Sequence, residues 1–169
     1  MYSETTFKEQ QQFRQVWLWT LLLVINALFI VGTIRQVYLG KSFGNNPSSN
    51  FELVSLTIMV LGILLLFVFM RLETAIDTIG VHYRFYPFHR KMRTIEWNRI
   101  SKAYTRKYNP IGEYGGWGIR SGIFGSGKAL NISGNKGLQL IYDNNQKLLL
   151  GTQKLNELET ILQQLGKTN

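Results

Sequence analysis

The chain has 169 residues, a net charge of +9 and no cysteine. The lack of cysteine excludes disulfide bonds, thiol catalysis and cysteine metal sites. A mean hydropathy of −0.04 is ordinary for a soluble domain, but here it averages two apolar segments with a basic remainder. The positive charge favours an acidic partner surface, and for a chain held in a membrane anionic lipid is a more natural partner than nucleic acid.

The first fifty residues contain a polar tail and a first apolar segment. Residues 1–15 are polar and show no clear periodicity, so we expect an N-terminal tail there. Residues 16–34 carry no charge and lie between Arg14 and Arg35. A signal peptide is the competing interpretation, but its apolar core is shorter and ends at a small-residue cleavage site, which this run lacks. The segment is therefore predicted to be a retained transmembrane helix.

A second apolar segment covers residues 53–70, eighteen residues without a charge. As a helix it spans about 27 Å, close to the hydrocarbon thickness of a bilayer. Residues 16–71 are thus predicted to form two transmembrane helices joined by a short loop. The basic residues just after the second span favour the cytoplasmic side for both termini. We expect a multi-pass protein of the cell's inner (cytoplasmic) membrane.

One polar residue, Asn26, falls near the middle of the first span. A buried amide in a membrane helix needs a hydrogen-bond partner. We expect it to bond to the other helix, at Ser55 or Thr57, or to a neighbouring copy of the chain.

From residue 72 onward the pattern changes to short runs rich in β-branched and aromatic residues, separated by glycine and asparagine, as in antiparallel strands. Residues 153–165 place leucine and isoleucine at helical spacing and end before Gly166, which predicts an amphipathic helix. The predicted fold class is α+β: a two-helix transmembrane hairpin, then an antiparallel β-barrel or sandwich of about seven strands, capped by the C-terminal α-helix. The expected strands cover residues 76–85, 92–97, 100–107, 117–121, 129–133, 138–142 and 147–151, with a hairpin turn at 143–145.

Three strings resemble membrane-anchored members of the bacterial PH-like domains: EYGGWGIR at 113–120, GNKGLQL at 134–140 and GTQK at 151–154. The resemblance covers residues 72–165, and two preceding spans are found in many such proteins. It implies a PH-like domain over residues 72–169. It implies no reaction and no site residue, because a shared fold does not carry a shared activity.

The basic run between residues 84 and 107 is the most informative charge feature, with eight lysines or arginines against the single acid Glu96. Because the run starts about a dozen residues after the second span, some of its charges are expected within about 10 Å of anionic head groups. The alternative is that these charges cover an exposed sheet surface and help to fix the membrane topology. The candidate lipid or partner contacts are Arg90, Lys91, Arg93, Lys102, Arg106 and Lys107.

Motifs for chemistry are weak. The string GIFGSGKA at 122–129 matches a phosphate-binding P-loop until Ala129, where a Ser or Thr should hold magnesium, and a strand rather than a helix is expected after it. We therefore expect a flexible hairpin loop there. His82 and His89 have no third ligand type nearby, and no GxSxG, HExxH or EF-hand pattern is present. The sequence predicts no metal, no cofactor and no enzymatic activity.

These patterns together predict a membrane-anchored PH-like module for binding or scaffolding at the cytoplasmic membrane surface. Its targets remain open between anionic lipid head groups, sensed through residues 84–107, and a membrane protein partner or another copy of the chain. The remaining alternative is an unrecognised membrane-bound enzyme. No nucleic-acid partner is expected.

Overall fold

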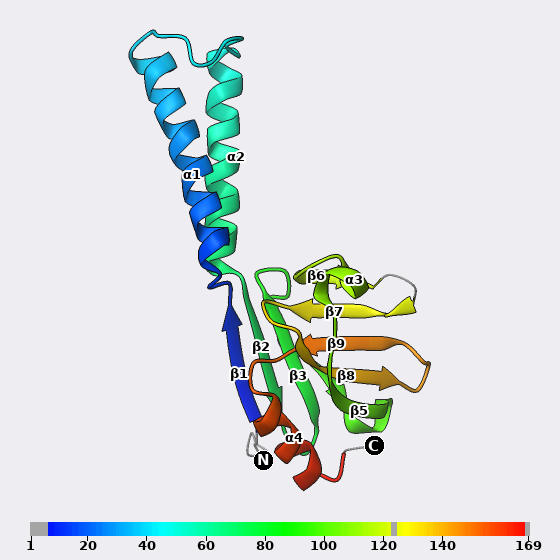
Figure 1. The fold of residues 1–169 in the computed structure, drawn as a ribbon. Helices are drawn as coiled ribbons and strands as arrows, with labels where there is room; N and C mark the ends of the chain where they lie inside the picture. The colour runs from blue at the N-terminus through cyan, green and yellow to red at the C-terminus, as the bar shows by residue number, and fades with distance from the viewer. Residues whose placement is uncertain (1–6, 123–124, 168–169) are drawn as a thin grey trace. The chain divides into compact units, whose positions relative to one another are not determined.

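The computed structural model describes residues 7–122 and 125–167 of the chain. The chain divides into two compact units. One is the helical hairpin Arg14–Phe69, and the other, here called the β unit, combines Met1–Phe13 with Met70–Asn169 (Figure 1). The expected tail over residues 1–6 lies outside the described residues.

The helical hairpin consists of two long helices that pack against each other. Helix α1 (Val16–Thr33) continues into a π-helical turn, η1 (Ile34–Tyr38), and a loop leads to α2 (Asn50–Phe69). The loop ends in a reciprocal cap, in which the Glu52 N–H donates to Ser49 Oγ and the Ser49 N–H donates to Glu52 Oε2. Both helices are long and apolar enough to cross a membrane, as the sequence predicts.

The polar contact inside the hairpin differs from the expected one. Asn26 Nδ2 donates to Leu22 O one turn back in α1, at 2.8 Å, so the expected bond to the other helix is wrong for the described hairpin. The hydroxyl oxygens of Thr33 and Thr57 lie 2.7 Å apart instead, and the Thr57 hydroxyl also donates to Leu53 O at 2.8 Å. Short polar side chains readily reach the backbone of their own helix, and spacing along one helix does not reveal that choice.

The segment expected to be a tail contains a strand. Strand β1 (Phe7–Gln12) pairs antiparallel with β2 (Arg71–Ile76) over its whole length, although the two lie on opposite sides of the helical hairpin in sequence. The prediction of a tail without folded structure is therefore wrong for Phe7–Gln12. The β unit includes a piece of chain that precedes both helices.

The buried side of β1 explains why its pattern was missed. Two of its inward-facing side chains are polar, and both bond to residues near the other end of the chain. Glu9 Oε2 accepts from the Thr152 hydroxyl at 2.6 Å, and Gln11 Nε2 donates to Gly151 O at 2.7 Å. A strand whose core face is satisfied by distant hydrogen bonds lacks the apolar alternation that marks a strand locally.

The first sheet has the order β1-β2-β3-β4, with β3 at Gly80–Tyr86 and β4 at Arg93–Glu96, and all its pairs are antiparallel. The expected single strand over 76–85 is broken by a turn at Asp77. Its Oδ1 accepts from the Ile79 N–H at 2.8 Å and from the Gly80 N–H at 3.0 Å, which is a common turn role for aspartate.

The second sheet has the order β5-β8-β9-β7-β6 (Figure 1). It follows the first sheet through a short 3-10 turn, η2, and a short helix, α3, lies between its first two strands in sequence. Its central pair β7–β9 is parallel, whereas all other pairs are antiparallel. The elements are η2 (Trp97–Arg99), β5 (Ile100–Lys107), α3 (Pro110–Tyr114), β6 (Gly118–Ser121), β7 (Lys128–Asn131), β8 (Lys136–Tyr142) and β9 (Lys147–Gly151).

Of the two predicted forms, a barrel or a sandwich of about seven antiparallel strands, the described residues show no closed barrel. The described residues form nine strands in two sheets, four and five strands wide. η2 turns the chain between β4 and β5, and these two strands do not pair in the described ladders, so the two sheets stay separate there. Strand β9 pairs with β8 on one side and with β7 on the other. Because the chain reverses direction between β7 and β8 and again between β8 and β9, β7 and β9 run in the same direction.

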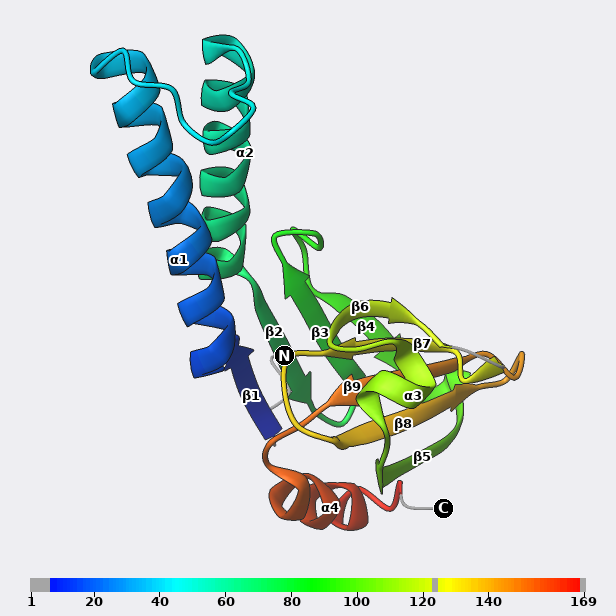
Figure 2. The ribbon, with the colours of Figure 1, turned by 45° about the horizontal axis from the view of Figure 1, so that its top comes forward.

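The C-terminal helix is confirmed at α4 (Leu155–Gln164). Leu158 and Leu162, one turn apart, are both buried, and α4 lies against β1 and β5 (Figure 2). Gly166 follows with a φ of +63°, the left-handed conformation that commonly ends a helix. This helix covers the core on which β1 and the second sheet converge.

Candidate functional site

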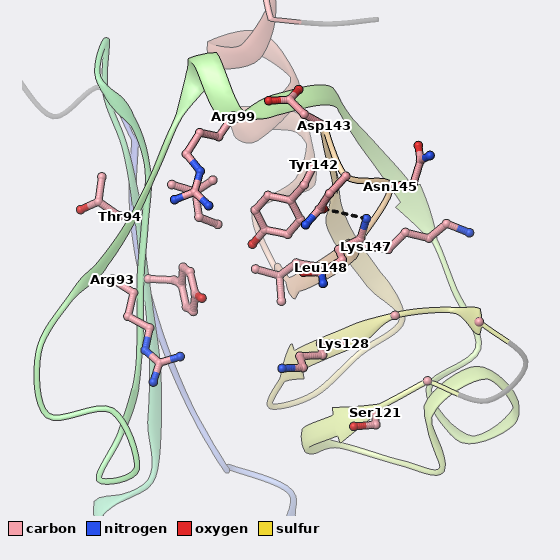
Figure 3. A pocket seen from close by; sticks show the side chains of 17 residues that line it. Arg93, Thr94, Arg99, Ser121, Lys128, Tyr142, Asp143, Asn145, Lys147 and Leu148 are labelled. Atoms are coloured by element: carbon pink, nitrogen blue, oxygen red, sulfur yellow. Dashed lines mark hydrogen bonds between the residues drawn. The ribbon is translucent and has the colours of Figure 1, made fainter.

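A pocket of about 840 Å³ opens between the two sheets of the β unit (Figure 3). One wall comes from β3, β4 and η2. The opposite wall comes from β7, the β8–β9 hairpin and the described residues between β6 and β7. This volume is typical of a site for a small molecule or a head group.

Basic side chains dominate the charge of the pocket. Arg93, Arg99, Lys128 and Lys147 line it, against the single acid Asp143. In the part of the chain that the structure describes, none of these four basic residues belongs to an ion pair. Figure 3 shows Arg99 pointing into the gap, whereas Asp143 and Lys147 point away from it. The pocket therefore holds uncompensated positive charge, which suits an anionic ligand.

The β4–η2 segment places the two arginines. Arg93 lies opposite Tyr83 in the β3–β4 ladder, so the two side chains share the face of the sheet that borders the pocket. Arg99 is the last residue of η2, and its carbonyl accepts from the Asp143 N–H at 3.3 Å. That bond joins the first wall to the β8–β9 hairpin.

The β8–β9 hairpin contributes a phenol. The turn expected at 143–145 is confirmed: the Asn145 N–H donates to Tyr142 O at 2.9 Å, and Asn145 has a φ of +62°. The ring of Tyr142 points into the gap (Figure 3). Burial and the neighbouring phenol of Tyr83 raise the pKa of Tyr142 to about 12, although Arg99 opposes the rise. At neutral pH this phenol is a hydrogen-bond donor, as an anionic ligand requires.

Lys128 enters the pocket from the string that resembled a P-loop. It is the first residue of β7 and lies between Ser121 of β6 and Leu148 of β9. The prediction that a strand follows this string is confirmed, so no helix presents its N–H groups to a phosphate there. The expected hairpin loop includes Ile123 and Phe124, which lie outside the described residues.

One histidine sits in an arrangement similar to a hydrolytic relay. His82 Nδ1 lies 2.8 Å from Thr94 Oγ1, and its Nε2 lies 3.1 Å from Asp77 Oδ1. Burial opposes ionisation of Asp77, but hydrogen bonds from His82 and from the backbone of its own turn hold its pKa below the ordinary value. Thr94 points away from the pocket (Figure 3). The trio therefore joins the turn at Asp77 to the β3–β4 strand pair.

The described residues also provide no set of metal ligands. Among residues 7–122 and 125–167, no group of three His, Cys, Asp or Glu side chains could hold a metal ion. The basic lining of the pocket suits recognition of a charged group of matching shape.

The six candidate contact residues fall into separate places. Only Arg93 lines the pocket. Arg90 and Lys91 are exposed between β3 and β4, and Lys102 and Lys107 are exposed on β5. Arg106 is the sixth and lies in a polar network.

That network satisfies Arg106 within the β unit. Its Nη2 donates to Glu113 Oε2 at 2.7 Å and to the Tyr114 hydroxyl at 3.2 Å, and its Nε donates to Gln139 Oε1 at 3.0 Å. Burial alone lowers the pKa of Arg106, but the bond and charge of Glu113 raise it above the ordinary value. The bond from Arg106 likewise lowers the pKa of Glu113. The charge of Arg106 is therefore already compensated.

Sequence reasoning missed most of the pocket. Arg99 belongs to the basic run, but its local sequence does not distinguish it from the other basic residues there. Lys128 was considered only as part of the P-loop-like string. Tyr142 and Lys147 lie about fifty residues further along the chain than Arg93, and no local spacing links them. Only the meeting of the two sheets brings these residues together.

A scan of the sequence against protein-family models found no match, and a search of curated proteins found none either. The geometry of the two units therefore carries the functional argument.

Proposed function

We propose that this chain is a membrane-anchored binding and scaffold module. The helical hairpin spans the membrane, and the β unit is a PH-like domain at the cytoplasmic surface that binds an anionic group in its pocket without catalysing a reaction. The anchor keeps the pocket near the bilayer and so raises the effective concentration of any target there.

The observation that carries this proposal is that the hairpin is apolar on nearly all sides. Val16, Phe51 and Ile58 are 80%, 82% and 64% exposed, and many other large apolar side chains of both helices are exposed too. A helix of a soluble protein turns one apolar stripe to a core, and an apolar surface of this extent needs a lipid or protein environment. The buried residues of the two helices are Leu22, Asn26, Gly32, Leu53 and Thr57.

The distribution of basic residues supports the orientation. The segment between α1 and α2 carries Arg35 and Lys41, whereas Arg71 comes two residues after the end of α2 and a further four lysines or arginines precede residue 94. The more basic flank of a membrane span generally stays cytoplasmic, and this supports a cytoplasmic location for the β unit and both termini. The proposed location is a bacterial inner membrane.

The β unit supports the PH-like assignment in its two facing sheets and its C-terminal amphipathic helix. It departs from the expectation in two respects, because β1 comes from before the helices and the sheets do not close. The walls of the pocket all come from residues after Met70, so β1 is not part of it.

An alternative is a sensor of anionic lipid head groups through residues 84–107. It is favoured by one observation, that Arg93 and Arg99 of this segment line the pocket. The shared chemistry is a phosphate-like group, carried either by a lipid or by a protein or solute partner. Self-association in the membrane is a further outcome that the experiments below detect.

The anchor is tested by fractionation of cells that produce the full chain. We expect it to stay in the membrane pellet at alkaline pH and to require detergent for extraction. A protease added outside spheroplasts should leave the β unit intact. A chain that is monodisperse in buffer without detergent, or a β unit digested from outside, contradicts the proposal.

The pocket is tested with the double variant Arg99→Glu/Lys128→Glu, and Lys102→Glu/Lys107→Glu is its control because it makes the same charge change on exposed residues of β5. Binding of inorganic pyrophosphate to the detergent-solubilised full chain is measured by calorimetry. We expect the pocket variant to lose binding and the control to retain most of it. Equal binding by the two variants contradicts the pocket as the site. Mass spectrometry of co-purified lipids and crosslinked proteins then distinguishes a head group, a protein partner and a second copy.

A further inference from the structure

The tip of the β3–β4 hairpin, residues 87–92, combines exposed apolar and exposed basic side chains. Phe88 and Met92 are 56% and 42% exposed, and Arg90 and Lys91 between them are exposed as well. An exposed phenylalanine beside paired cations is the composition of a segment that enters a membrane interface. No acidic residue occurs between positions 84 and 95.

The tip is held in place by its own contacts. The His89 N–H donates to Phe85 O at 2.8 Å, and Arg84 Nη1 donates to Arg90 O at 3.4 Å. The rings of Phe85 and Phe88 lie 6.3 Å apart, yet Phe88 keeps more than half of its surface exposed. The tip therefore presents Phe88 as an exposed apolar side chain close to two exposed cations.

The nearest acid does not neutralise the tip. Glu73 already pairs with Arg71 and Arg84 on the outer face of the sheet. Arg90 and Lys91 belong to no ion pair in the described part of the chain. Their charge is therefore available to an anionic surface.

Strand register places the tip at one particular end of the first sheet. Tyr86, just before the tip, lies opposite Arg71, the first residue of β2, and Arg71 in turn lies opposite Gln12, the last residue of β1. Arg71 comes two residues after the end of α2, and Gln12 comes four residues before the start of α1. The chain therefore leads into α1, and returns from α2, at the end of the sheet that carries the tip.

We propose that residues 87–92 dock into the cytoplasmic leaflet of an anionic bilayer, with Phe88 and Met92 in the interface and Arg90 and Lys91 against lipid phosphates. This inference rests on the proposed function in one respect, that α2 crosses the membrane. A link of one residue then joins α2 to β2, and a link of three residues joins β1 to α1, both at this end of the sheet. Chain connections alone keep the tip within about 20 Å of the end of α2.

The opposite end of the same sheet supplies a matched control. Ile79, in the turn between β2 and β3, is 52% exposed and resembles Phe88 in exposure and apolar character. It is separated from the tip by the length of β3, about 20 Å. Docking by the tip predicts that Ile79 stays in water.

The chain has no cysteine, so a single introduced cysteine carries a spin label at one position only. We would label Phe88→Cys, Met92→Cys, Ile79→Cys and, on α2, Ile58→Cys in the full chain. Each variant is placed in lipid nanodiscs with and without phosphatidylglycerol. Accessibility to oxygen, which concentrates in lipid, is compared with accessibility to a water-soluble nickel complex.

With phosphatidylglycerol we expect labels at 58, 88 and 92 to favour oxygen several-fold more than the label at 79. Adding Arg90→Glu/Lys91→Glu to the 88 variant should return that label to water, whereas Lys102→Glu/Lys107→Glu should not. A label at 88 that matches 79 while 58 stays in lipid overturns the docking and leaves the anchor intact. A label at 58 in water overturns the proposed function itself.

Discussion

Arg106 and Arg99 come from the same basic run, yet the fold gives them opposite surroundings. Arg106 donates to Glu113 and Gln139, which compensate it, whereas Arg99 points into an open pocket with no ion pair among the described residues. The difference shows that a count of lysines and arginines does not identify a binding site. A binding site is indicated instead by a cation to which the folded protein supplies no ion-pair partner.

The same contrast separates the two sides of the second sheet. On one side α3 lies over a cluster of Tyr108, Tyr114, Ala129 and Leu149, all buried. On the other side Leu148, the strand neighbour of Leu149, lines the pocket. Adjacent residues of β9 therefore face a closed core and an open site, because side chains alternate along a strand.

The largest expected effect comes from Leu149→Ala. It leaves a cavity in the closed cluster and should lower the free energy of unfolding by about 3 kcal/mol. Leu148→Ala should cost roughly half as much, because it enlarges a pocket that is already open to water. Urea unfolding of the full chain in detergent, followed by tryptophan fluorescence, measures both. Equal costs would contradict the division into a closed and an open face.

Arg106→Ala should have the next largest effect on the free energy of unfolding. It removes a charged hydrogen-bond network that is about a quarter exposed, so we expect a loss of roughly 1.5 kcal/mol in the free energy of unfolding. Arg99→Ala should stay within about 0.5 kcal/mol of the wild type, because Arg99 has no such network. The same unfolding experiment tests the pair. A larger cost for Arg99→Ala than for Arg106→Ala would reverse the comparison.

The pH dependence of the closed face should show a smaller effect. The bond from Arg106 lowers the pKa of Glu113 below its ordinary value of 4.5, so the ionised form stabilises the fold. A lowered pKa adds stability above the unfolded-state value, and this stability is lost as the pH falls through the folded-state value. The free energy of unfolding of the wild type should therefore exceed that of Glu113→Gln by at most about 1 kcal/mol at neutral pH. The two values should converge once the pH falls below the folded-state pKa of Glu113, and a difference that persists there would point to another cause.

The sequence predicts the elements whose signals are local. The two apolar helices, β5 at Ile100–Lys107, β9 at Lys147–Gly151 and the turn between β8 and β9 are found where the patterns place them. Helical spacing in α4 likewise gives its two buried leucines. These features depend on runs, periods and turn residues within a few positions of one another.

The sequence does not predict what depends on distant partners. β1 was missed because Glu9 and Gln11 find their hydrogen bonds near residue 152. The choice between a barrel and a sandwich stayed open because the strand pattern does not show that β5 begins a second sheet after η2. The pocket was missed for the same reason, since Arg93 and Tyr142 meet only when the two sheets face each other. The basic run pointed to the correct chemistry, but it ranked the compensated Arg106 with Arg93 and left Arg99 out.

The smallest expected effect is a change in the ionisation of Tyr142, without a change in stability. With a pKa of about 12, about one tenth of this phenol should be ionised at pH 11, where an exposed tyrosine is mostly ionised. Arg99 favours the phenolate, so Arg99→Ala should raise the pKa of Tyr142 and reduce that fraction further. Arg106→Ala, on the other side of the sheet, should leave it unchanged. Nuclear magnetic resonance of labelled tyrosine, with Tyr142→Phe to assign the signal, measures the fraction. If only Arg106→Ala altered it, the pocket would not be where the charge of Arg99 acts.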